Sequence, residues 1–132
     1  VTLDAASSRA QEARVWQGRV LQSMGRLDES IGAFRKAVDG SSKPRQVMEA
    51  TNYLAKALIL KGDFDNAESA LQHAEEIVNK VIAADAVQAD ALHKALDGMS
   101  ARKALQKARD KQHGASKDAK ALEEVKGGSL PK

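Results

Sequence analysis

Two stretches of this sequence are variants of one unit. Residues 18–38 read GRVLQSMGRLDESIGAFRKAV, and residues 55–75 read AKALILKGDFDNAESALQHAE. Aligned without a gap, they pair Leu21 with Leu58, Gly25 with Gly62, Leu27 with Phe64, Asp28 with Asp65, Phe34 with Leu71 and Ala37 with Ala74. A unit used twice indicates a repeat protein, because one such unit cannot bury its apolar face alone and neighbouring units must stack.

Glycine and proline divide the chain into segments of roughly 10 to 20 residues, the usual length of a helix. The breaks fall at Gly25, at residues 40–44, at Gly62 and at Gly98. Aspartates follow two of the glycines, where a side-chain oxygen and a negative charge suit the start of a helix. The candidate caps are Asp28 for one helix and either Asp63 or Asp65 for the other. The sequence therefore predicts alternating helices and short turns.

The composition favours the same structure. Of 132 residues, 42% are hydrophobic, yet only four are aromatic and 24 are alanine. Alanine is the best helix former, whereas a β-sandwich or barrel needs more Val, Ile, Thr and aromatic residues. The absence of cysteine excludes disulfides and thiolate metal sites, and no apolar run approaches the roughly 18 residues that span a bilayer. We expect a soluble all-α protein, with the compartment open between the cytoplasm and an organellar lumen.

The repeated unit resembles the tetratricopeptide repeat, a helix-turn-helix of 34 residues. That family places two small residues, two large apolar residues, a turn glycine, an aromatic or apolar residue and an alanine at fixed spacings. In the unit begun at Gln11 these slots hold Gly18, Leu21, Gly25, Leu27, Ser30, Phe34 and Ala37. In the unit begun at Met48 they hold Ala55, Leu58, Gly62, Phe64, Ala67, Leu71 and Ala74. Every slot fits, although the family's usual Trp and Pro are missing.

A third unit follows by the same step, beginning at Ile82. Its slots hold Ala89, Leu92, Leu96, Gly98, Ala101, Leu105 and Ala108. Leu96 and Gly98 do not suit the pattern, so we expect a displaced or reshaped turn there. The resemblance implies a right-handed α-α superhelix of stacked repeats at residues 11–44, 48–81 and 82–115. These repeats form a domain of residues 1–114, followed by a solvating helix and flexible tail over residues 115–132.

The resemblance also implies a concave groove lined by the first helix of each repeat. The side chains presented there would be Glu12, Val15, Trp16, Arg19, Gln22 and Ser23 from the first unit, Glu49, Asn52, Tyr53, Lys56, Ile59 and Leu60 from the second, and Ala83, Ala86, Val87, Asp90, His93 and Lys94 from the third. This mixture suits an amphipathic or extended peptide. Arg19 and Lys56 could bind carboxylates, and Asn52 a backbone amide.

Two aromatic residues, Trp16 and Tyr53, fall in equivalent places near this groove. Large rings with a polar atom are frequent interface anchors, so both are candidates for contact with a partner. The alternative is that both pack beneath a neighbouring helix. Arg19 and Lys56 are either partner contacts or solvated surface charge. A subfamily that clamps the acidic tails of chaperones requires residues that are replaced here by Val15, Arg19 and Tyr53, so its clamp does not fit.

No catalytic, metal-binding or cofactor motif is found in the sequence. His73, His93 and His113 lie 20 residues apart, which excludes the spacing of a helical metal pair. The glycine-rich phosphate loops and the nucleophile elbow of common enzymes are absent. We therefore expect no enzyme, no cofactor, no metal and no small-molecule substrate.

The sequence predicts a protein–protein interaction module, a scaffold or adaptor that binds a peptide or helix of a partner in its groove. Two alternatives stay open. One is helical packing or self-association, suggested by the absence of a helix breaker from Gln72 to Val87 and by the apolar patch of Ile77, Val78, Val81 and Ile82 within it. The other is weak nucleic-acid contact through the basic C-terminal segment, with Arg102, Lys103, Lys107, Arg109 and Lys111. The acidic middle of the chain argues against a nucleic-acid binder, which needs a continuous basic face.

Overall fold

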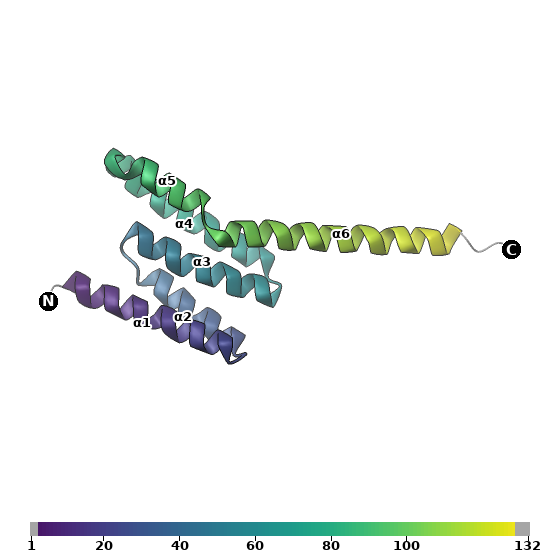
Figure 1. Ribbon diagram of the computed structural model, residues 1–132, viewed down its shortest axis with the longest axis horizontal. Coiled ribbons are helices and arrows are strands. Elements are labelled where there is room, and N and C mark those ends of the chain that lie inside the picture. Colours follow the sequence, from purple (N-terminus) through teal and green to yellow (C-terminus); the bar gives the residue numbers. More distant parts are fainter. Residues whose placement is uncertain (1–2, 129–132) are drawn as a thin grey trace.

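The computed structural model describes residues 3–128, and the side chains of residues 8–115. Within this range every regular element is a helix, which confirms the predicted fold class (Figure 1). The elements are α1 (Leu3–Ser23), α2 (Leu27–Asp39), α3 (Pro44–Lys61), α4 (Phe64–Ala84), the short 3-10 helix η1 (Ala86–Gln88), α5 (Ala89–Asp97) and α6 (Ser100–Gly128). None of these helices is long and apolar enough to cross a membrane.

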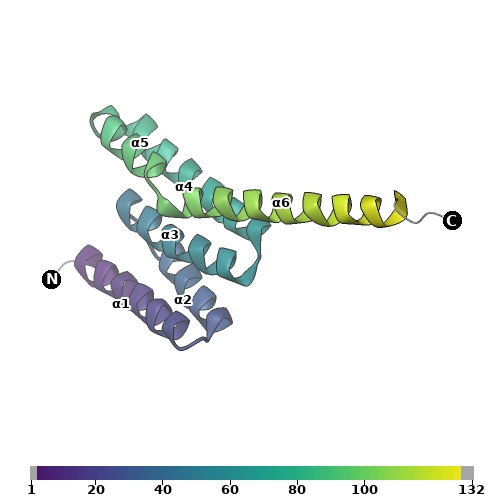
Figure 2. The same ribbon diagram turned by 45° about the vertical axis from the view of Figure 1, so that its right-hand side comes forward.

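Two helix hairpins, α1–α2 and α3–α4, stack side by side (Figures 1 and 2). Each reverses direction at a glycine with a positive φ, 78° at Gly25 and 85° at Gly62. At the second turn, Gly62 N–H donates to the backbone oxygen of Ile59, and Asp63 N–H donates to that of Leu58. The same pair of bonds closes the first turn. This is the Schellman motif, which glycine closes without steric cost.

Small residues lie where the two helices of each hairpin cross. The Ser30 hydroxyl donates to the backbone oxygen of Gly18 at 2.7 Å, and a Cβ on Gly18 would stand 2.4 Å from the ring of Phe34. In the second hairpin, Ala55 and Ala67 occupy the equivalent places and are fully buried. The close approach of the helices lets a core with few large side chains pack without voids.

Of the two aspartates predicted as alternative caps, Asp63 is the one that caps α4. It precedes α4 and accepts a hydrogen bond from the backbone N–H of Asn66 at 3.3 Å. The side-chain hydrogen bond from Asn66 also holds the pKa of Asp63 below its ordinary value. The predicted side-chain cap at Asp28 is wrong, because α2 begins at Leu27 without one, but Asp28 does place its negative charge in the first turn of α2 as predicted. The Asp28 side chain pairs with Lys61 at 2.8 Å, and this hydrogen bond raises the pKa of Lys61.

The third unit does not form a hairpin between α5 and α6. The two helices are not packed along each other, and α6 continues from the end of α5 after a bend (Figure 1). The cause lies at Gly98, whose φ is −85°. Its N–H donates to the oxygen of Lys94, and Met99 N–H donates to that of Leu96. Without a left-handed residue the chain bends instead of reversing.

α6 lies along α3 and α4 and then extends beyond the rest of the fold (Figures 1 and 2). Residues 82–84, which were expected to open the third repeat, belong to the end of α4. The expected domain boundary at residue 115 falls inside α6, which runs to Gly128 without a break. Of the expected flexible tail, residues 129–132 lie outside the described residues.

Candidate partner-binding furrow

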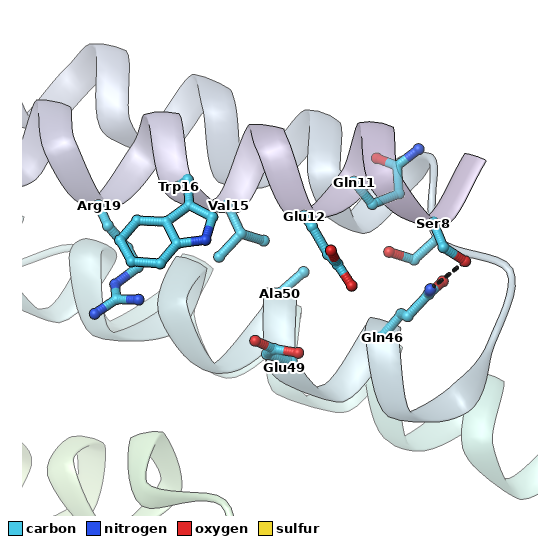
Figure 3. A pocket seen from close by; sticks show the side chains of 10 residues that line it. Ser8, Gln11, Glu12, Val15, Trp16, Arg19, Gln46, Glu49 and Ala50 are labelled. Atoms are coloured by element: carbon cyan, nitrogen blue, oxygen red, sulfur yellow. Dashed lines mark hydrogen bonds between the residues drawn. The ribbon is translucent and has the colours of Figure 1, made fainter. Parts of the chain in front are cut away.

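A furrow runs between α1 and α3, the first helices of the two hairpins. It consists of two hollows, of about 240 Å³ and about 400 Å³. Arg19 lines both hollows and joins them. Figure 3 shows the first hollow, into which side chains of α1 point toward α3. We call the two hollows together the furrow.

Arg19 is held between two aromatic rings. Its guanidinium carbon lies 4.5 Å from the centre of the Trp16 ring and 5.3 Å from the centre of the Tyr53 ring. Tyr53 stacks in turn on the buried ring of Phe34, with 5.6 Å between the ring centres. Such contacts between a cation and the face of a ring are attractive. They place a cationic donor at the middle of the furrow, against a Tyr53 ring that packs on the core.

The two aromatic candidates lie in different surroundings. Trp16 is 61% exposed, so the alternative that it packs beneath a neighbouring helix is wrong. Tyr53 is half-buried, and one face of its ring packs on the core through Phe34. It also lines the second hollow, beside Lys56 and Leu60. Tyr53 therefore packs on the core with one face and lines the furrow as well, and its contact with a partner stays a prediction.

Four charged side chains line the furrow in two rows. Glu12 and Glu49 line the first hollow, and Arg19 and Lys56 line the second. The two members of each row stand 37 residues apart in the sequence, the same offset that relates the two repeats. Among the residues whose side chains are described, none of these four forms an ion pair. The second hollow is therefore lined by positive charge alone, and the first, which Arg19 also reaches, by a net negative charge.

The end of the furrow beyond the glutamates contains residues that the repeat pattern did not indicate. The Gln46 amide donates to the Ser8 hydroxyl at 2.8 Å and ties α1 to α3 there (Figure 3). Ser8 precedes the first expected repeat, so the repeat register gave no reason to select it. Gln11 is buried against Gly40, where a Cβ would stand 2.2 Å from its amide nitrogen. This amide fills the space between the start of α1 and the end of α2.

Of the predicted groove residues, eight do not line the furrow. Asn52 faces the last helix: its side-chain oxygen accepts from the backbone N–H of Ala101 at 2.8 Å, and its amide donates to Ser100 at 3.1 Å. Asn52 therefore caps α6. The other seven are Ile59, half-buried against the core, Ala83, exposed at the end of α4, Ala86 and Val87, exposed on η1, and Asp90, His93 and Lys94, exposed on α5. The third unit contributes no side chain to the furrow, which lies between α1 and α3.

The basic C-terminal segment is partly neutralised by α4. Arg102 pairs with Glu75 at 2.9 Å, and Arg109 pairs with Glu68 at 2.6 Å. Both arginines are therefore engaged in holding α6 against α4. Within the described part of the chain, no group of three or more potential ligands could hold a metal ion.

The chain is similar to a known protein family over part of its length. Residues 16–80 match the family model described as tetratricopeptide repeat. The match covers most of both hairpins and ends before the irregular third unit. Neither the curated proteins nor the solved structures gave a significant match.

Proposed function

Because residues 16–80 belong to the tetratricopeptide repeat family, whose repeats generally mediate protein–protein interaction or scaffolding, we propose that this chain binds a segment of a partner protein in the furrow. Repeats of this family are typically interaction modules and not enzymes. The observation that carries the proposal is the stack of Trp16, Arg19 and Tyr53, which places a cation beside an exposed indole.

These three residue types are the ones most often found at the energetic centre of interfaces. Their rings bury a large area on binding and lose little conformational freedom. Arg19 pays less entropy than a free surface arginine because the two rings already restrict it. The furrow therefore has a preformed anchor point, with open space on either side to receive the rest of a segment.

Charge reversal in the furrow tests the proposal. The variant carrying Arg19→Glu and Lys56→Glu should lose the captured partner in a pull-down from native lysate, with its helical signal near that of the unchanged chain. A matched control carries Lys36→Glu and Lys80→Glu, the same charge change on exposed positions of α2 and α4, which do not line the furrow. The control should retain the partner. Equal partner loss in both variants would count against the furrow.

Photo-crosslinking locates the contact independently of affinity. A crosslinking residue at Gln22, which lines the second hollow, should join the captured partner. The same crosslinking residue in place of Lys80 should not join the partner. Crosslinks from position 80 alone would show that the partner binds on the α4 side and not in the furrow.

Self-association is a second candidate, favoured by the outer face of α1. In α3, which packs against α2, Ala50 and Ala57 are buried. Their equivalents in α1, Ala13 and Val20, are exposed, and Met24 beside them is 60% exposed. The face that accepts a neighbouring helix in α3 is thus uncovered in α1. The segment from Gln72 to Val87, which the sequence suggested for self-association, is interrupted where α4 ends at Ala84.

Sedimentation velocity over a range of concentrations decides this second candidate. A dimer that dissociates on Val20→Glu or Met24→Glu supports packing through the outer face of α1. Neither residue lines the furrow, so partner capture by these variants should be unchanged. A monomer at every concentration would remove the candidate.

A further inference from the structure

We propose that the ligand of the furrow is an extended segment that carries one basic and one acidic side chain about 10 Å apart. This inference rests on the proposed function, since it assumes that a protein segment binds there. It adds the chemistry of that segment. The observation behind it is the pair of charged rows described above.

The separation of the rows follows from helix geometry. Glu12 and Arg19 are seven residues apart on α1, and Glu49 and Lys56 are seven residues apart on α3. With a rise of 1.5 Å per residue, each pair spans about 10.5 Å along its helix. α1 and α3 run in the same direction (Figures 1 and 2). The two glutamates therefore stand opposite each other at one level, and the two cations at the next.

The size of the hollows selects the shape of the ligand. A helix with its side chains is about 10 to 12 Å wide, whereas the hollow between the glutamates measures about 240 Å³ and admits only a few side chains. An extended chain advances about 3.3 Å per residue. Opposite charges about three residues apart on such a chain would reach both rows.

Each ligand charge would meet two protein charges of opposite sign. Glu12 and Glu49 would receive a Lys or Arg, while Arg19 and Lys56 would receive an Asp, a Glu or a chain-terminal carboxylate. The described side chains leave all four groups without an ion pair, so no ion pair among these side chains must break on binding. A purely acidic segment would place like charges against the glutamate row, which is unfavourable.

Selection from a display library of short randomised peptides tests the inference. We expect enrichment of peptides with one basic and one acidic residue about three positions apart. Synthetic versions lacking Trp can be titrated by the emission of Trp16, the only tryptophan of the chain. A peptide with both charges should bind at least about tenfold more tightly than its acid-only or base-only counterpart, and the difference should shrink at high salt.

Two variants separate the rows. With Glu12→Gln and Glu49→Gln, the preference for the basic residue should vanish while the preference for the acidic residue stays. With Arg19→Gln and Lys56→Gln, the preference for the acidic residue should vanish while the preference for the basic residue stays. The control variant with Lys36→Glu and Lys80→Glu should enrich the same peptides as the unchanged chain does.

The outcomes distinguish this inference from the proposed function. Enrichment of acid-only peptides, or of peptides with no charge pattern, would overturn the two-row inference and leave segment binding in the furrow intact. Failure to enrich any peptide would also overturn it. In that case the crosslink from Gln22 to a native partner would still decide the proposed function, because that measurement does not depend on the charges of the ligand.

Discussion

Replacing Gly18 by alanine should destabilise the protein, although alanine favours a helix. The added Cβ would stand 2.4, 2.6 and 2.9 Å from three ring atoms of Phe34. Phe34 is completely buried and stacks on Tyr53. The hydrogen bond from Ser30 to the Gly18 oxygen also holds α1 and α2 at this distance. Neither the Phe34 ring nor the helices α1 and α2 can move away from the added Cβ without losing other contacts.

The magnitude follows from two opposing effects. Inserting a carbon into a well-packed core typically costs about 1 to 3 kcal/mol. Three contacts shorter than 3.0 Å place this site near the upper end of that range. Alanine returns about 1 kcal/mol through its helix propensity. The net loss in the free energy of unfolding should be about 2 kcal/mol.

Gly32 supplies the matched control. It lies inside α2, where an added Cβ would meet nothing within 4 Å. Gly32→Ala should therefore stabilise the protein by roughly 0.5 to 1 kcal/mol. The assay is urea unfolding followed by far-ultraviolet circular dichroism, with the slope of the transition checked for each variant. The same chemical change should thus move stability in opposite directions at the two glycines.

A second substitution tests whether the ring is the cause. The other hairpin pairs Ala55 with Leu71, where the first pairs Gly18 with Phe34. Gly18→Ala combined with Phe34→Leu should therefore lose less stability than the sum of the two single changes. Strict additivity, or a Gly18→Ala protein as stable as the Gly32→Ala protein, would refute the packing argument.

Three further predictions follow from local geometry. Gly62→Ala should lower the free energy of unfolding, measured in urea, by about 1 to 2 kcal/mol because of the positive φ of this residue. Gly98→Ala should lower it clearly less, because the φ of Gly98 is negative. Equal losses in the two variants would contradict this. Asn52→Ala should cost about 0.5 to 2 kcal/mol and speed hydrogen exchange at the start of α6, while Asn52→Asp, which keeps the accepting oxygen, should lose less. The lowered pKa of Asp63 means that its carboxylate stabilises the fold above its unfolded pKa. The stability gap between the unchanged chain and Asp63→Ala should therefore narrow as the pH falls below roughly 4; a gap independent of pH would contradict it.

The hairpins could be predicted because their turns depend on a local signal. At Gly25 and Gly62 the residue that permits a positive φ stands at the repeated position, and both turns form there. The third unit kept most of the apolar pattern but had Leu96 at that position. Apolar spacing alone does not reverse a chain, so α5 bends into α6.

The furrow could be predicted in part. Trp16, Arg19, Tyr53 and Lys56 lie along it because the repeat register fixes which face of each first helix is concave. Asn52 was predicted from the same repeat register, but it forms a hydrogen bond with α6, and the sequence did not indicate where α6 lies. The contact of Arg19 with two rings depends on how closely α1 and α3 approach, and a repeat pattern carries no such distance.

The central claim is that a partner segment lies against the stack in the furrow. Trp16 reports on this directly, as the single tryptophan and one that is 61% exposed. The measurement is iodide quenching of its emission with and without a saturating amount of the captured partner segment. The account predicts marked protection from iodide in the complex, lost together with binding in the Arg19→Glu and Lys56→Glu variant. A segment that binds fully and leaves Trp16 as accessible to iodide as before would contradict it.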